Sequence, residues 1–184
     1  MKLINRMTLL FFMVTIMGTM TAILTPSVAE AKDWTGALFP EFELKNQAGE
    51  VISDNKYEGK WVAYYFYPKD NTPGCSIEAE NFAKNHKKFQ ELGLEIVGIS
   101  LDDVESHKSF AKTYNVEFDL LADVDKSLSK KLDMVNYLPW PHTRRETFIV
   151  DGSGNIVKHY QEVNPKSHVE QIFADLKTLK KQLK

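Results

Sequence analysis

The stretch WVAYYFYPKDNTPGC, residues 61–75, decides the fold because two kinds of secondary structure meet within it. Residues 61–67 are aromatic, β-branched or small, which is typical of a buried strand. Pro68 ends this pattern, and from Ser76 onward hydrophobic residues recur at helical spacing. The stretch therefore predicts a strand, a turn and the start of a helix, with Cys75 in the first helical turn.

Cys75 is the only cysteine among the 184 residues. The first turn of a helix carries unpaired N–H groups and the positive end of the helix dipole. Both favour the thiolate over the thiol, and the thiolate is the reactive species. Because Cys75 shares a helix face with Ala79 and Phe82, we expect its thiol to be half sheltered. The alternative is an inert buried thiol, but an activating position makes Cys75 the main functional clue.

Composition limits the classes of protein to consider. The chain is long enough for one ordinary domain, and 43% hydrophobic with 26% charged residues is normal for a globular protein. The formal net charge of −2 provides no basic field for nucleic acid. We therefore expect no nucleic-acid partner.

Residues 1–31 are predicted to be a signal peptide. Two basic residues precede an uncharged apolar stretch over residues 7–24. A small-x-small pattern follows, so we expect cleavage after Ala31 or, at a second site, after Ala29. The domain would then span residues 32–184 of an exported protein, secreted or in a bacterial periplasm. An uncleaved membrane anchor is the alternative, because the apolar stretch is at the short limit for a spanning helix.

The remaining chain alternates strands with helices. After a hairpin over residues 42–52, we expect strands at 61–67, 95–100, 119–123, 146–150 and 156–160, and helices at 75–91, 104–115, 126–132 and from 165 onward. Such alternation predicts an α/β fold with a mostly parallel sheet flanked by helices. The hairpin late in the chain adds antiparallel strands, so the sheet is mixed.

The positions of the other residues relative to Cys75 exclude or disfavour several roles for this cysteine. Glu78 occupies the position where a dithiol redox motif needs its second cysteine. The five histidines are scattered, which argues against a zinc site. His142 could serve as the base of a cysteine protease, but nothing else supports that machinery. Attack of a thiolate on a small electrophile remains, and it needs a nearby cation. Beyond the predicted signal peptide, Arg144 and Arg145 are the only arginines; they could equally form a surface pair.

Two segments resemble a known family. Residues 65–79, YFYPKDNTPGCSIEA, resemble the active-site segment of the peroxiredoxins and are most similar to the bacterioferritin comigratory protein, or PrxQ, subfamily. Residues 145–151, RETFIVD, with Gly154 and Ile156 after them, are similar to the second signature of that family. The resemblance implies a thioredoxin-like fold with an N-terminal hairpin, and antioxidant peroxidase activity.

The resemblance also implies roles for individual residues. Cys75 would be the peroxidatic cysteine, which attacks the peroxide and becomes a sulfenic acid. Thr72 would hydrogen-bond the peroxide, and Pro73 would shield the thiolate from water. Arg145 would hold thiolate and peroxide together, and Glu78 would help to orient the site. The expected chemistry needs no haem, metal or flavin cofactor.

One departure from the subfamily changes the expected mechanism. Many members carry a resolving cysteine five residues after the first, where this chain has Glu80. The resemblance therefore implies a one-cysteine mechanism with an external thiol reductant of the thioredoxin, glutaredoxin or small-thiol type. A redox sensor or binding protein that forms mixed disulfides through Cys75 is the alternative. The sequence leaves open whether the protein is a monomer or a homodimer, and whether residues 138–142 form a pocket wall, a docking site or a rigid loop.

Overall fold

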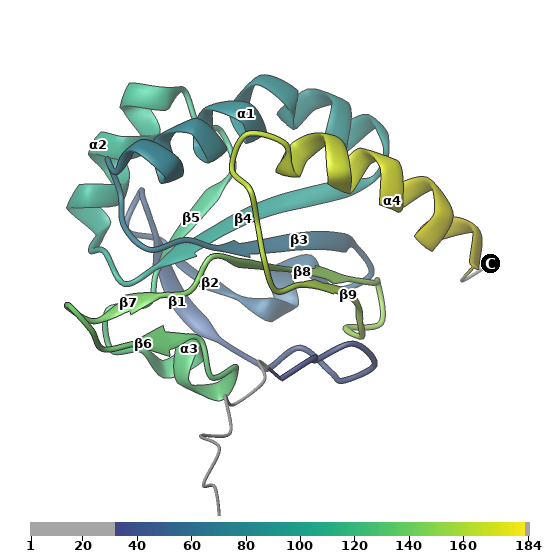
Figure 1. The fold of residues 1–184 in the computed structure, drawn as a ribbon, viewed down its shortest axis with the longest axis horizontal. Helices are drawn as coiled ribbons and strands as arrows, with labels where there is room; N and C mark the ends of the chain where they lie inside the picture. Colours follow the sequence, from purple (N-terminus) through teal and green to yellow (C-terminus); the bar gives the residue numbers. More distant parts are fainter. Residues whose placement is uncertain (1–31, 183–184) are drawn as a thin grey trace, which may run out of the picture. The chain divides into compact units, whose positions relative to one another are not determined.

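A seven-stranded mixed sheet organises residues 32–182, the residues that this computed structural model describes (Figure 1). Its strands are β1 (Glu43–Asn46), β2 (Val51–Ser53), β3 (Trp61–Phe66), β4 (Leu94–Ser100), β5 (Asp119–Ala122), β8 (Glu146–Val150) and β9 (Ile156–Tyr160), in the order β2-β1-β5-β4-β3-β8-β9. The predicted signal peptide lies outside the described residues.

The central strand β3 is buried on both faces, as its nearly continuous apolar sequence predicts. It runs parallel to β4 and antiparallel to β8. Ala63 and Tyr65 pack into one hydrophobic cluster, whereas Val62 and Tyr64 pack into the other. This alternation follows from the two-residue period of a strand. The chain that leaves β3 therefore starts from the most firmly packed part of the sheet.

The helices cover the two faces unequally. On one face lie α1 (Pro73–Glu91), α2 (Val104–Tyr114) and α4 (His168–Gln182), which are drawn together on one side of the sheet in Figure 1. The short α3 (Ser127–Lys131) packs on the opposite face through Leu128. Because β3, β4 and β5 are parallel neighbours joined by α1 and α2, right-handed connections place both helices on the same face.

Helix α1 buries one stripe and begins earlier than predicted. Its buried residues are Cys75, Glu78, Ala79, Phe82, His86 and Phe89. Thr72 is the N-cap and Pro73 the first helical residue, a position that suits proline because its nitrogen has no hydrogen to leave unpaired. The helix ends at Glu91, and Gly93 follows at a φ of 67°, the left-handed conformation that glycine adopts readily.

The predicted hairpin near the N-terminus is confirmed, because β1 pairs with β2 in antiparallel register. A second small sheet was not predicted. It consists of β6 (Val135–Asn136) and β7 (His142–Thr143), which bracket the stretch left open in the sequence. Strands of two residues have no detectable periodicity, so sequence patterns miss them. Between these strands the side chains of Tyr137, Leu138 and Trp140 are exposed. Within the described residues, no helix is long and apolar enough to cross a membrane.

Candidate active site

The thiol of Cys75 lies at the carboxyl end of β3. The connection over residues 67–72 turns the chain away from the sheet, and Asn71 adopts a left-handed φ of 58° within it. Cys75 is then the third residue of α1. The predicted placement of the cysteine in a first helical turn is therefore confirmed.

Two backbone donors are available beside this thiol. The first intrahelical hydrogen bond of α1 runs from the amide of Ser76 to the carbonyl of Thr72, at 2.9 Å. Thr72 makes no side-chain capping bond to the helix start. Within the described residues, the amides of Gly74 and Cys75 thus have no acceptor, as the first turn of a helix leads one to expect. Unpaired amides at a helix start stabilise negative charge on the cysteine sulfur.

Arg145 reaches the thiol from a different strand. The antiparallel register pairs Phe66 with Glu146, which puts the residue before β8 next to the end of β3. Nη2 of Arg145 lies 3.1 Å from Sγ of Cys75. Its Nη1 donates to Oε2 of Glu78, one turn along α1. One guanidinium therefore contacts both the thiol and a carboxylate, which a planar fork of donors permits.

The thiol is more buried than the predicted half-sheltered position, since only 1% of Cys75 is exposed. Arg145 contacts the sulfur from a distant part of the chain, and Cys75 belongs to the hydrophobic cluster that α1 forms with the sheet. A Cβ atom added to Gly74 would lie 3.2 Å from Nη2 of Arg145 and 3.6 Å from Cγ of Pro165. Glycine at this position therefore lets both groups approach the first turn of α1 closely.

Glu78 is almost completely buried, and among residues 32–182 its atom Oε1 has no hydrogen-bond partner. Burial raises the pKa of this carboxyl to about 7, although the Arg145 guanidinium acts in the opposite direction. Burial also opposes the charge on Arg145, but the Glu78 carboxylate and the Cys75 sulfur outweigh it and raise the pKa of the guanidinium. Arg145 is therefore held in its charged form between two acidic groups.

His168, the first residue of α4, is buried close enough to Arg145 to feel its charge and was not identified from the sequence. Its Nε2 lies 2.8 Å from the hydroxyl of Thr147, and its ring packs edge-on against Phe82. Burial and the nearby charge of Arg145 lower the pKa of His168 to about 4. A lone histidine at a helix start carries no sequence signal that separates it from an ordinary core residue.

The two candidate arginines lie in different environments. Arg144 donates from Nε to Oε1 of Glu146 at 2.5 Å, and its Nη2 lies 3.9 Å from the sulfur of Met134. Met134 belongs to the hydrophobic cluster opposite the one that contains Cys75. The structure thus brings Arg145, and not Arg144, to the cysteine.

The other predicted site residues surround the thiol differently. Pro73 is exposed at the start of α1. The hydroxyl of Thr72 donates to the carbonyl of Lys69 at 2.9 Å, which leaves its oxygen lone pairs free to accept. His142, the possible protease base, is engaged through Nδ1 with the carbonyl of Trp140 at 2.7 Å. Among residues 32–182, no group of three or more His, Cys, Asp or Glu side chains is placed to hold a metal ion.

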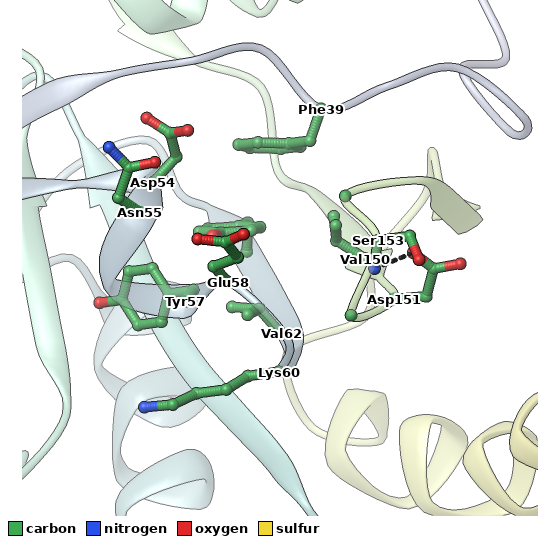
Figure 2. Close-up of a pocket in the computed structure, with 13 residues that line it drawn as sticks. Phe39, Asp54, Asn55, Tyr57, Glu58, Lys60, Val62, Val150, Asp151 and Ser153 are labelled. Atoms are coloured by element: carbon green, nitrogen blue, oxygen red, sulfur yellow. Dashed lines mark hydrogen bonds between the residues drawn. The ribbon is translucent and has the colours of Figure 1, made fainter.

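A cavity of about 230 Å³ lies elsewhere in the domain (Figure 2). Its walls include Lys60 and Val62 at the start of β3, and Val150 at the end of β8. Cys75 instead follows the opposite end of β3. The cavity is therefore separate from the cysteine and takes no part in its chemistry.

The raised pKa of Glu78 predicts a pH dependence of stability. The carboxyl titrates near 4.5 in the unfolded chain and near 7 in the folded protein, so the folded state binds more protons between these values. The stability that this group contributes is complete below pH 4.5 and is lost as the pH rises through 7. Glu78→Gln cannot titrate. We expect wild type to lose about 1–3 kcal/mol more than the variant between pH 5 and pH 8.

Urea unfolding of both reduced proteins at several pH values measures this difference. Parallel stability curves for wild type and Glu78→Gln would contradict the inferred environment of the carboxyl.

Comparison with known proteins agrees with this geometry. The family model described as AhpC/TSA family matches residues 35–159. Chloroplastic peroxiredoxin Q of Sedum lineare is 39% identical over 151 residues, which cover 82% of this chain and 81% of that protein. Peroxiredoxin Bcp of Bacillus subtilis is 36% identical over 149 residues, 78% of this chain and 95% of its own.

A solved structure shows the same architecture. The bacterioferritin comigratory protein of Xanthomonas campestris, described for its alkyl peroxide reduction, superposes with a TM-score of 0.70 at 29% identity. The match covers 74% of this chain and 90% of that one. The thioredoxin-like fold expected from the sequence is thus confirmed. The chain belongs to the AhpC/TSA family, among the thiol-dependent peroxidases of the peroxiredoxin Q and Bcp group.

Proposed function

We propose that this protein reduces hydrogen peroxide and organic hydroperoxides with Cys75 as its sole redox-active residue. The 3.1 Å contact between Arg145 Nη2 and the cysteine sulfur carries this proposal. It joins a cation to a thiol that already sits at a helix start, and both features favour the thiolate. The alkyl peroxide reduction described for the Xanthomonas relative supports organic hydroperoxides as substrates.

In the first step, the thiolate of Cys75 attacks the terminal oxygen of the peroxide. A sulfur–oxygen bond forms as the oxygen–oxygen bond breaks, and the leaving alkoxide takes the proton of the peroxide to depart as an alcohol or water. Sulfur is oxidised to the sulfenate and the peroxide is reduced. Arg145 and the free amides of Gly74 and Cys75 stabilise the charge that develops at the breaking bond.

The remaining site residues orient these groups. Thr72 has already donated its hydrogen to Lys69, so its oxygen would accept the hydrogen bond of the peroxide O–H. Pro73 would shield the mouth of the site from water. Glu78 would fix the guanidinium of Arg145 by its buried ion pair with Nη1, so that the other nitrogen, Nη2, points at the sulfur of Cys75.

In the second step, an external thiol restores the enzyme, because Cys75 is the only cysteine in the chain. The thiol attacks the sulfenic acid, forms a mixed disulfide and releases water. A second thiol then attacks that disulfide and frees Cys75. The reductant is of the thioredoxin, glutaredoxin or small-thiol type, and the enzyme acts as a monomer or homodimer.

We further propose that the enzyme is exported and that its signal peptide is removed by cleavage after Ala29, which releases residues 1–29, or after Ala31, which releases residues 1–31. The charge and hydropathy pattern of these residues supports export. Intact mass of protein recovered from the periplasm or the medium identifies the cleavage site. Recovery of the full-length chain from membranes would favour the anchor instead.

Turnover distinguishes the enzyme from a sensor. A buried thiol without a partner cysteine could also belong to a sensor that stores one mixed disulfide. Such a sensor consumes only one equivalent of peroxide. We expect continued consumption of hydrogen peroxide and cumene hydroperoxide, over many equivalents per Cys75, when dithiothreitol or a thioredoxin system is supplied. A single equivalent with every thiol tested would establish the sensor.

A further inference from the structure

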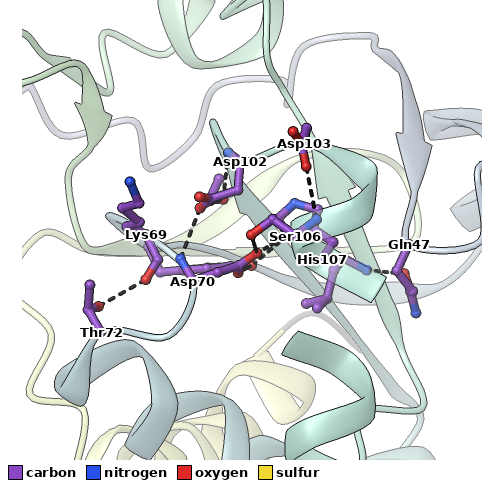
Figure 3. Close-up of polar contacts among 11 residues, drawn as sticks. Gln47, Lys69, Asp70, Thr72, Asp102, Asp103, Ser106 and His107 are labelled. Atoms are coloured by element: carbon purple, nitrogen blue, oxygen red, sulfur yellow. Dashed lines mark hydrogen bonds and ion pairs between the residues drawn. The ribbon is translucent and has the colours of Figure 1, made fainter. Parts of the chain in front are cut away.

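The connection between β3 and α1 is held by a buried carboxylate, that of Asp70 (Figure 3). Its Oδ1 accepts from the hydroxyl of Tyr67 at 2.8 Å. Its Oδ2 accepts from the hydroxyl of Ser106 and from Nδ1 of His107, each at 2.8 Å. Only 4% of Asp70 is exposed. Three donors, one from the connection itself and two from α2, therefore satisfy a carboxylate that is removed from water.

The backbone of the same residue is also fastened. The amide of Asp70 donates to Oδ2 of Asp102 at 2.9 Å, and that oxygen accepts from the hydroxyl of Ser100 at 2.7 Å. Asp102 lies at the junction between β4 and α2. Main chain and side chain of one residue thus tie the connection before α1 to the start of α2, as the bonds drawn in Figure 3 show.

This arrangement is costly, which argues that it does more than fill the core. His107 is fully buried, and its Nε2 has no hydrogen-bond partner within the described part of the chain. An unpaired buried polar atom costs roughly 1–3 kcal/mol, and an apolar residue of similar size would avoid that cost. The neighbouring Asn71 adds a left-handed backbone conformation. Strained or unsatisfied groups of this kind gather where geometry serves function.

The two halves of the candidate active site come from different parts of the chain. Arg145 directly precedes β8, and Thr143, two residues before it, donates to the carbonyl of Tyr67 at 2.6 Å. Thr72 and the first turn of α1 instead follow the fastened residue 70 directly. The relation between Cys75 and Arg145 therefore depends on where the connection over residues 68–72 is held.

We infer that Asp70 is a positioning residue for the peroxide reaction, and that His107 acts through it. The inference rests on the proposed function of Cys75. Asp70 fixes the path of the chain into Thr72 and so sets the donors of the first turn against Arg145. Misplacement of reacting groups by about 1 Å can lower a rate by about 10²-fold, so loss of this anchor has a measurable kinetic effect.

Asp70→Asn tests the inference. Ser106 and His107 both donate to the wild-type carboxylate, and the N–H₂ group of an asparagine amide would face these donors with another donor, so the anchor would be lost. We expect the second-order rate constant with hydrogen peroxide to fall about 30- to 100-fold. Alkylation of Cys75 by iodoacetamide needs a reachable thiolate but no donors aligned on a breaking oxygen–oxygen bond. We expect the alkylation rate to change by less than about threefold. The ratio of the peroxide rate to the alkylation rate therefore falls.

Asp123→Asn is the matched control. Asp123 is also a fully buried aspartate, and it accepts from the amides of Leu128 and Ser129 at the start of α3. Its side chain bonds to the start of α3 and not to the connection before α1, so its replacement lowers stability while the ratio of peroxide to alkylation rates stays at the wild-type value. Urea unfolding of both variants confirms that rates are measured on folded protein.

His107 supplies a second test if Asp70→Asn does not fold. The variant His107→Asn keeps a donor near the place of Nδ1, whereas the variant His107→Leu removes this donor. We expect His107→Asn to retain most of the wild-type rate ratio and His107→Leu to lower it at least tenfold. A purely structural role predicts the same ratio in every folded variant, and that result would overturn the inference. Slow oxidation of wild-type Cys75 would instead overturn the proposed function.

Discussion

We expect the replacement of Cys75 by serine to abolish peroxide reduction. The first step needs a nucleophile that is ionised near neutral pH, and a hydroxyl is not ionised there. The chain has no other thiol that could act in its place. We expect a loss of about 10⁴-fold or more, to the uncatalysed background. Loss of peroxide in a stopped-flow experiment, with thiol present, measures the effect.

The serine variant should keep its fold, because oxygen is smaller than sulfur and the buried site can accept it. Near-native circular dichroism and a cooperative urea transition serve as the control. Activity close to that of wild type would show that the reaction does not pass through Cys75, and the proposed mechanism would then be wrong.

Removal of Arg145 has the second largest expected effect. Arg145→Ala takes away the only cation that contacts the sulfur among the described residues, and it leaves the buried carboxylate of Glu78 without its partner. We expect the second-order rate constant with peroxide to fall about 10²- to 10³-fold. Arg145→Lys keeps a charge but cannot contact sulfur and carboxylate together, so we expect only partial recovery.

Arg144→Ala is the matched control for this prediction. Arg144 contacts Glu146 and Met134 on the side away from the cysteine. Its loss lowers stability but should leave the peroxide rate within about threefold of wild type, because its contact with Met134 lies on the face of the sheet opposite the cysteine. A larger loss of rate in Arg144→Ala than in Arg145→Ala would mean that the functional arginine has been chosen wrongly.

Most of the fold could be predicted because local patterns and global packing agree. The apolar run over 61–67 needed burial on both faces, and the central strand β3, parallel to β4 and antiparallel to β8, provides it. Helix α1 carried an apolar stripe, an N-terminal proline and a glycine after its last turn. Those signals act over a few residues and so remain visible in a single sequence. The small β6–β7 sheet has no such signal, because its two short strands depend on contacts with the end of β3.

The candidate site was predicted only in part. The helix-start position of Cys75 follows from residues beside it in sequence. Its near-complete burial does not, because Arg145 and the hydrophobic cluster around Cys75 come from parts of the chain that are distant in sequence. The distinction between Arg144 and Arg145 likewise depends on strand register, since successive residues point to opposite faces of a sheet.

The buried polar groups around the site were the least predictable. Asp70 and His107 are 37 residues apart and meet only when α2 packs beside α1. His168 reaches Thr147 from the start of the last helix. In a sequence, each of these residues is indistinguishable from a polar residue in a turn or at a helix end.

The measurement that tests the central claim most directly is the intact mass of the reduced protein after a brief, stoichiometric pulse of hydrogen peroxide. The account predicts a rapid gain of one oxygen atom at Cys75, trapped as a sulfenic acid adduct and reversed by added thiol with continued turnover. Slow or absent oxidation would contradict it, since a thiolate held at a helix start against Arg145 should react at once. Cys75 would then be an ordinary buried thiol.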